Sequence, residues 1–138
     1  MKYLAVIDTN VIVSALLTDN QSKPGKILEY INNGVITPAY NEDILAEYKE
    51  VLSRNKFPFS EETVDKTLQL ITNTGVELGK TDIDEQMTDE SDVVFYQIVL
   101  TANMIQMSYL VTGNIKHFPK RVFIVTPNEM IDIIESQK

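Results

Sequence analysis

Two polar side chains that can bind a hard cation follow predicted strands of this sequence. Asp8 comes directly after the apolar run 3–7, and Asn114 lies two residues beyond Thr112, which closes a later apolar run. Ligands of parallel sheets bind beyond the carboxyl ends of the strands, so both side chains are expected at one rim. The alternative is structural, with Asp8 as a turn or cap residue and Asn114 as a turn residue.

Glu47 is a third candidate, because it lies at the edge of an apolar helix stripe. It follows Ile44 by three residues and precedes Val51 by four, spacings that place all three side chains near one face. A carboxylate so close to the core costs free energy unless it has a partner. The alternative is that Glu47 reaches water or pairs with Arg54.

Asp89 and Asp92 precede a long apolar segment that is predicted to be helical. Acids at this position can cap the helix and are stabilised by its dipole. Two acids spaced by three leave one free of the capping role. The spacing favours Asp89 as the cap and Asp92 as the group that points into the rim.

Gathered carboxylates predict one kind of chemistry. Mg²⁺ and Mn²⁺ prefer oxygen ligands, and a bound ion can lower the pKa of a water and offset charge on a phosphorus atom. One or two ions are compatible with the sequence. Neighbouring acids also repel each other, so without metal at least one is expected to have a raised pKa.

Strands and helices alternate along the chain, which predicts an α/β fold in one domain covering residues 1–138. Strands are expected over 3–7, 35–37, 76–78, 109–112 and 122–125. Helices are expected over 11–17, 26–32, 41–52, 61–72, from 91 to beyond 102, and over 127–134. This alternation indicates a three-layer α/β/α sandwich with a mostly parallel sheet of about five strands. Thr9 or Asn10 is expected to cap the first helix, and the helix from Ser91 is expected to be deeply packed.

The composition excludes several classes of protein. The sequence has 138 residues, no cysteine and a net charge of −8, which leaves no disulfide framework, thiolate zinc site or thiol nucleophile. The acidic balance counts against strong non-specific binding to nucleic acid. No segment has the length of a signal-peptide core or a membrane span, so a cytoplasmic protein without a membrane partner is expected.

Four motifs in order resemble one known family. They are Val-Ile-Asp-Thr-Asn-Val-Ile-Val-Ser-Ala (6–15), Glu-Tyr-Lys-Glu-Val-Leu-Ser-Arg (47–54), Asp-Glu-Ser-Asp-Val-Val-Phe-Tyr (89–96) and Tyr-Leu-Val-Thr-Gly-Asn (109–114). Together they resemble PIN-domain proteins, and more narrowly the bacterial VapC-like toxins of toxin–antitoxin systems.

The resemblance implies a ribonuclease that depends on Mg²⁺ or Mn²⁺ and leaves a 5′-phosphate and a 3′-hydroxyl. It places the metal-binding acids at Asp8, Glu47 and Asp92, and a fourth catalytic position at Asn114, where the family often has aspartate. Asparagine can ligate through its carbonyl or position a water, with one negative charge fewer. The family also implies an RNA substrate, a homodimer and, for a toxin, a cognate antitoxin.

Further candidates lie beside these four. Asn10 and Thr112 fall where the resemblance implies water-holding or supporting groups, although helix capping and strand termination explain them equally well. Lys116 could neutralise a phosphate and Phe118 could stack on a base. His117, the sole histidine, could act near neutral pH or simply pack in a loop.

Two other functions fit parts of the pattern. A dehalogenase-type phosphatase also places an aspartate after its first strand, but it usually has a second aspartate at the position of Asn10. A non-enzymatic module that binds RNA or a protein would explain Asn114 and the acidic balance. Nucleotide-cofactor folds are excluded, because the sequence has neither GxGxxG nor a P-loop.

Overall fold

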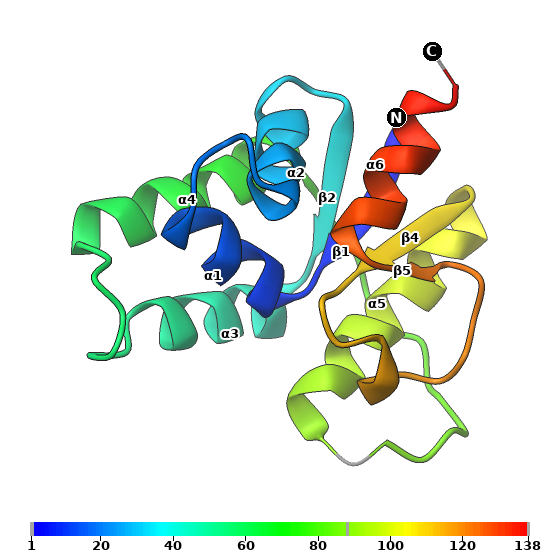
Figure 1. The fold of residues 1–138 in the computed structure, drawn as a ribbon. Coiled ribbons are helices and arrows are strands. Elements are labelled where there is room, and N and C mark those ends of the chain that lie inside the picture. Colours follow the sequence, from blue (N-terminus) through cyan, green and yellow to red (C-terminus); the bar gives the residue numbers. More distant parts are fainter. Residues whose placement is uncertain (1, 88, 138) are drawn as a thin grey trace.

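The computed structural model describes residues 2–87 and 89–137 and shows an α/β fold built on a five-stranded parallel sheet (Figure 1). The strands, in the spatial order β3-β2-β1-β4-β5, are β1 (Tyr3–Ile7), β2 (Ile36–Tyr40), β3 (Val76–Glu77), β4 (Ser108–Val111) and β5 (Ile124–Val125). The helices are α1 (Thr9–Leu17), α2 (Lys23–Asn32), α3 (Glu42–Leu52), α4 (Glu61–Thr74), α5 (Glu90–Ile105) and α6 (Pro127–Glu135), with a short 3₁₀ helix η1 (Ile115–His117). The predicted fold class is therefore confirmed.

The central strand, β1, fixes the position of the candidate site. All its residues are buried, as expected for a continuous apolar run in a parallel sheet covered on both faces. It pairs with β2 on one side and β4 on the other, and Ile7 lies opposite Val111. The residues that follow these two strands, Asp8 and Thr112, therefore emerge side by side.

Helices cover the sheet on both faces. The chain moves outward from β1 to β2 and then crosses back from β3 to β4, so right-handed connections place α2 and α5 on opposite faces. In agreement, α5 packs on β1, β2 and β4, while α2 packs on β2 and contacts α6 (Figure 1). No helix within residues 2–87 and 89–137 is long and apolar enough to cross a membrane.

Helix starts follow local chemistry. Asn41 caps α3 through its side chain, as predicted, and Thr126 and Glu129 form a capping box at the start of α6. The first helix differs from the prediction. Thr9 and Asn10 lie inside α1 rather than before it, and Asp8 occupies the cap position without a side-chain capping bond.

Strand boundaries differ most from the prediction at two places. β2 continues through Pro38 to Tyr40, whereas the prediction ended it before the proline. Only Ala39 and Tyr40 of β2 pair with β3, so the missing N–H of Pro38 lies outside that ladder. At the other edge Val122 is 94% exposed and precedes β5, which begins only at Ile124.

Two helices also differ from their predicted form. α2 begins at Lys23, three residues early, because Ser22 caps it and a proline is tolerated in its first turn. The long helix α5 is packed on one side rather than all round. Val94 and Leu100 are only half-buried, and Met104 at its end is 73% exposed.

Candidate active site

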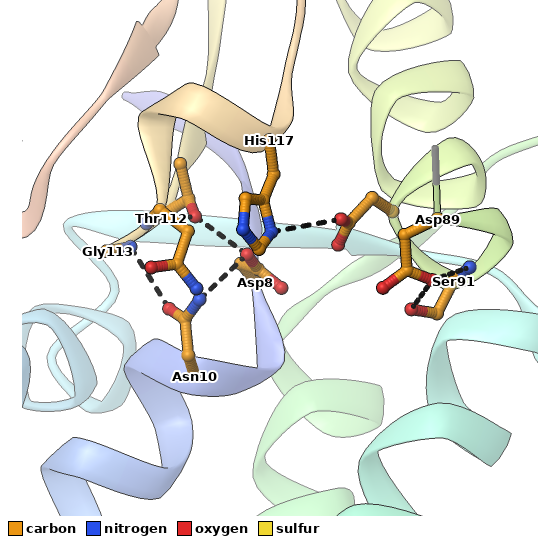
Figure 2. Close-up of polar contacts among 9 residues, drawn as sticks. Asp8, Asn10, Asp89, Ser91, Thr112, Gly113 and His117 are labelled. Atoms are coloured by element: carbon orange, nitrogen blue, oxygen red, sulfur yellow. Dashed lines mark hydrogen bonds and ion pairs between the residues drawn. The ribbon is translucent and has the colours of Figure 1, made fainter. Parts of the chain in front are cut away.

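Asp8 is a buried carboxylate held by two neighbouring side chains. Its backbone N–H donates to the Val111 carbonyl (2.9 Å), which continues the β1–β4 pairing by one residue. The Asp8 Oδ2 atom accepts hydrogen bonds from Thr112 Oγ1 (2.7 Å) and Asn10 Nδ2 (3.0 Å) (Figure 2). Burial raises the pKa of Asp8, and the hydrogen bonds from Thr112, Thr9 and Asn10 oppose that rise.

Asn10 and Thr112 also accept hydrogen bonds from the loop that follows β4. The Gly113 N–H donates to Asn10 Oδ1 (3.0 Å), and the Asn114 N–H donates to Thr112 Oγ1 (2.9 Å). Asn10 therefore uses both ends of its amide, one on the carboxylate and one on the loop (Figure 2). Neither Asn10 nor Thr112 acts only as a cap or a strand end.

Asp92 is a buried carboxylate with little compensation. It lies in the first turn of α5 and is 8% exposed, and its Oδ2 atom makes no hydrogen bond. His117 Nδ1 lies 3.3 Å from that oxygen, within ion-pair range but without hydrogen-bond geometry. Burial, together with the charges of Asp8 and Asp89, raises the pKa of Asp92 to about 6, against an opposing effect of His117.

Asp89 takes the capping role that the spacing predicted. Its Oδ1 atom accepts hydrogen bonds from the Ser91 N–H (3.0 Å) and Ser91 Oγ (2.8 Å) (Figure 2). These bonds lower the pKa of Asp89, so this carboxylate is satisfied at the helix start. Asp92 is thereby left to face the interior of the site, as predicted.

Glu47 reaches the site from α3. Its side chain is half-buried and accepts a long hydrogen bond from Thr9 Oγ1 (3.4 Å), and burial raises its pKa. Arg54 instead pairs with Glu50, at 2.8 Å and 3.2 Å between nitrogens and oxygens. The alternative in which Arg54 neutralises Glu47 by direct pairing is therefore wrong.

These acids share one cavity of about 600 Å³. Its lining contains all four predicted catalytic residues, Asp8, Glu47, Asp92 and Asn114. It also contains three of the predicted neighbours, Asn10, Asp89 and His117, while Thr112 lies buried behind Asp8. The separate stretches singled out in the sequence therefore meet at the carboxyl ends of the strands.

Residues 4–116 match the family model described as PIN domain. The chain belongs to the PIN domain family. No curated protein matches the chain. PIN domains are generally nucleases and typically use Mg²⁺ or Mn²⁺, so this PIN domain has a nuclease-type fold. The match runs from β1 into η1 and includes every acid described above.

The predicted basic and aromatic spot on η1 is partly wrong. Phe118 is 7% exposed and belongs to the hydrophobic core, so it offers no face to a base. Lys116 is exposed and does not line the cavity, although its sequence neighbours Asn114 and His117 do. Only His117 from this segment faces the acids of the PIN domain.

A second basic and aromatic segment does line the cavity, and the sequence reasoning missed it. Lys56 and Phe57 lie just after α3 and form part of the lining. The signal was the run Lys-Phe-Pro-Phe at 56–59, directly after the helix that carries Glu47. It gave no indication by itself that this loop lines the cavity.

The donors of the PIN domain suit a hard divalent ion in their chemistry. Carboxylate oxygens are the ligands that Mg²⁺ and Mn²⁺ prefer. The buried Asp92 Oδ2 atom has no hydrogen-bond partner, and a bound cation would compensate its charge. Within residues 2–87 and 89–137, no three acidic or histidine side chains are gathered closely enough to hold a metal as they stand.

Proposed function

We propose that this PIN domain is an endoribonuclease that uses Mg²⁺ or Mn²⁺, as one or two ions, to hydrolyse phosphodiester bonds in RNA. Asp8, Glu47 and Asp92 would hold the metal. The observation that carries this proposal is the arrangement at the cavity. Three carboxylates from three separate elements face the same space, and each has a raised pKa.

The energetics favour a bound cation. A buried carboxylate costs free energy unless a charge or hydrogen bonds compensate it, and here the acids also repel one another. Among the described residues that line the cavity, Arg54 is engaged by Glu50, and His117 is the basic side chain that contacts an acid of the site. A divalent ion, when bound, would offset this charge, lower the pKa of a water and polarise the phosphate.

The residues of the chain each have a task in this proposal. Thr112 and Asn10 hold Asp8 in one orientation, which limits the reorganisation needed on binding. Asn114, which lines the cavity, would position a water or ligate through its carbonyl. His117 would neutralise Asp92 when protonated and release it when a metal binds.

The direct test is cleavage of mixed RNA by the wild-type protein and by Asp8→Asn, with Mn²⁺ and with EDTA. We expect cleavage only by the wild type with Mn²⁺. Cleavage that persists in EDTA or in Asp8→Asn would contradict the proposal. RNA binding that survives EDTA, with no cleavage in Mn²⁺, would instead support a non-enzymatic binding module.

The phosphatase alternative lacks its acid/base group. The position two residues after Asp8 is Asn10, and both ends of that amide are engaged in holding Asp8 and Gly113. A covalent aspartyl-phosphate on Asp8 would revive this alternative.

We also propose that the protein is the toxin of a toxin–antitoxin pair, acts as a homodimer and folds as one domain. The four motifs that resemble VapC-like toxins support the first two parts. Induced expression is expected to arrest growth and Asp8→Asn to relieve the arrest, while size-exclusion chromatography with light scattering measures the oligomeric state. Growth that continues unchanged on expression of the wild type would contradict the toxin role.

A further inference from the structure

The segment that connects α3 to α4 (Figure 1) carries a basic and aromatic run, and part of this run lines the cavity. A turn brings the chain back on itself here, because the Phe57 N–H donates to the Arg54 carbonyl (3.0 Å). Arg54, Lys56 and Phe57 from this turn line the same cavity as the acids. The segment therefore belongs to the site in space, although it is remote from Asp8 in sequence.

Phe57 is a ring held in place at the edge of the core. It stacks on Phe59, with 5.4 Å between ring centroids and 17° between planes. Phe59 packs against the hydrophobic core, whereas Phe57 is half-buried and is not among the described residues that pack there. Phe59 thus anchors Phe57 while leaving part of its ring in the cavity wall.

Lys56 provides an available positive charge next to this ring. Its Nζ atom lies 5.1 Å from the Phe57 centroid, and its side chain is exposed. The other basic side chains that line the cavity contact acids, since Arg54 pairs with Glu50 and His117 lies beside Asp92. Of the described residues in the lining, Lys56 is the one cation without an acidic partner.

The cavity links this segment to the carboxylates. Glu47 and Val51, four residues apart on α3, both line it, and that spacing covers about 6 Å along a helix. Lys56 and Phe57 follow the end of α3, which lies away from the end of β1 (Figure 1). A group bound there would be a neighbour of the reacting phosphate and not that phosphate itself.

We propose that Lys56 and Phe57 form a subsite for an unpaired nucleotide that flanks the bond to be cleaved in RNA. The base stacks on the Phe57 ring, and Lys56 moves from the ring to neutralise the adjacent phosphate. A base inside a duplex has both faces covered and is excluded from this contact. The inference rests on the proposed ribonuclease function and assigns these two residues of the chain to the nucleotide beside the cleaved bond.

The subsite also answers an electrostatic problem. The chain has a net charge of −8, and the acids of the site would repel the phosphates on either side of the reacting one. An aromatic platform contributes binding that does not depend on charge. A single free lysine beside it supplies local attraction without making the surface basic.

Binding of a labelled single-stranded RNA, measured by fluorescence anisotropy in the Asp8→Asn background with Mn²⁺, tests the subsite. Phe57→Ala is expected to raise Kd about 5- to 100-fold, and Phe57→Tyr to restore binding. Lys56→Ala is expected to raise Kd by up to about tenfold and to reduce the salt slope by about 0.7. Lys66→Ala, which removes an equal but remote charge from α4, is expected to leave binding unchanged.

A direct readout of stacking is available because the chain contains no tryptophan. Phe57→Trp introduces a sole indole whose fluorescence should be quenched by single-stranded RNA and not by the matching duplex. Val122→Trp, at a site that is 94% exposed and outside the cavity, is the matched control and should show no such quenching.

The outcomes separate this inference from the proposed function. Loss of binding in Phe57→Ala and quenching in Phe57→Trp would support the subsite even if the wild type cleaved nothing. RNA cleavage by the wild type, with unchanged Kd and KM in folded Phe57→Ala and Lys56→Ala, would overturn the subsite alone. Failure of the Asp8→Asn protein to bind RNA, or equal binding of duplex and single strand, would also overturn it.

Discussion

Asp8 and Asp92 face the same cavity but are stabilised in opposite ways. The carboxylate at the end of β1 accepts two side-chain hydrogen bonds, from Thr112 and Asn10. The carboxylate in the first turn of α5 has a buried oxygen with no hydrogen bond and only His117 nearby. Asp8 is fixed in place by the fold, whereas Asp92 is left short of a partner.

This difference indicates what each end of the site contributes. Hydrogen bonds that favour the ionised form keep Asp8 oriented as a ligand, although burial still raises its pKa. Asp92 has a pKa of about 6 because nothing of equal strength opposes its burial. Burial of the ionised Asp92 therefore lowers the unfolding free energy, and a bound cation would offset this loss.

The largest expected effect is on cleavage by Asp92→Asn. Removing a ligand and its charge should slow RNA cleavage in Mn²⁺ by about 100-fold or more, since metal stabilisation of the transition state amounts to several kcal/mol. Single-turnover rates on labelled RNA measure this. Asp132→Asn, an exposed change on α6, should keep the wild-type rate, and a similar rate in Asp92→Asn would remove Asp92 from the site.

The next effect concerns the support of Asp8. Thr112→Val removes the hydroxyl that donates to Asp8 Oδ2 and keeps the shape of the side chain. We expect cleavage to fall about 10- to 100-fold, which is typical for a group that orients a metal ligand. Thr72→Val, whose hydroxyl bonds only to carbonyls of its own helix, is the matched control. Equal rates for the two variants would show that Asp8 needs no such support.

The pH dependence of stability tests the burial of Asp92. Its folded-state pKa of about 6 lies above its usual value of 3.8, so the folded protein binds more protons than the unfolded chain between these values. The unfolding free energy of the metal-free protein should therefore fall as pH rises from about 4 to 7. Asp92→Asn should reduce this fall by about 1 to 3 kcal/mol, as measured by urea unfolding in EDTA.

Asp8 and Glu47 also have raised pKa values, so part of the fall should persist in Asp92→Asn. The same urea series with Asp132→Asn serves as the control, because this aspartate is exposed. Identical pH profiles for wild type and Asp92→Asn would mean that Asp92 is not desolvated in solution.

The smallest expected effect is that of His117→Gln. His117 lowers the pKa of Asp92, so its loss should raise that pKa, which carboxyl NMR can follow. Cleavage should change by less than about tenfold, because the proposal gives His117 no proton-transfer role. General acid–base catalysis by a histidine would be worth about 100-fold or more. A loss of 100-fold or more would instead make His117 a catalytic residue.

Much of the fold was predictable because buried parallel strands have an unambiguous pattern. The apolar run 3–7 indicated the central strand, and Asn41 and Pro127 marked helix starts that the structure confirms. Val122 misled the prediction, since an exposed valine and a buried one look alike in sequence. The apolar faces of α5 were also ambiguous, because hydrophobicity alone does not reveal which side the sheet covers.

The acids of the site were predictable for a different reason, which is that strand ends and helix starts occupy known places at the rim of a parallel sheet. The division between Asp89 as cap and Asp92 as interior acid followed from spacing alone. The exposure of side chains on loops could not be predicted from spacing. Phe118 is buried and Phe57 lines the cavity, a contrast that depends on how two irregular segments pack.

Mn²⁺ binding by the metal-free protein can be measured without RNA. Isothermal titration of metal-free protein should show binding by the wild type and by Asp132→Asn, and at least about tenfold weaker binding by Asp8→Asn and Asp92→Asn. Equal binding by all four proteins would contradict the proposal that the carboxylates lining the cavity hold the metal. So would a wild-type protein that binds no Mn²⁺ while remaining folded.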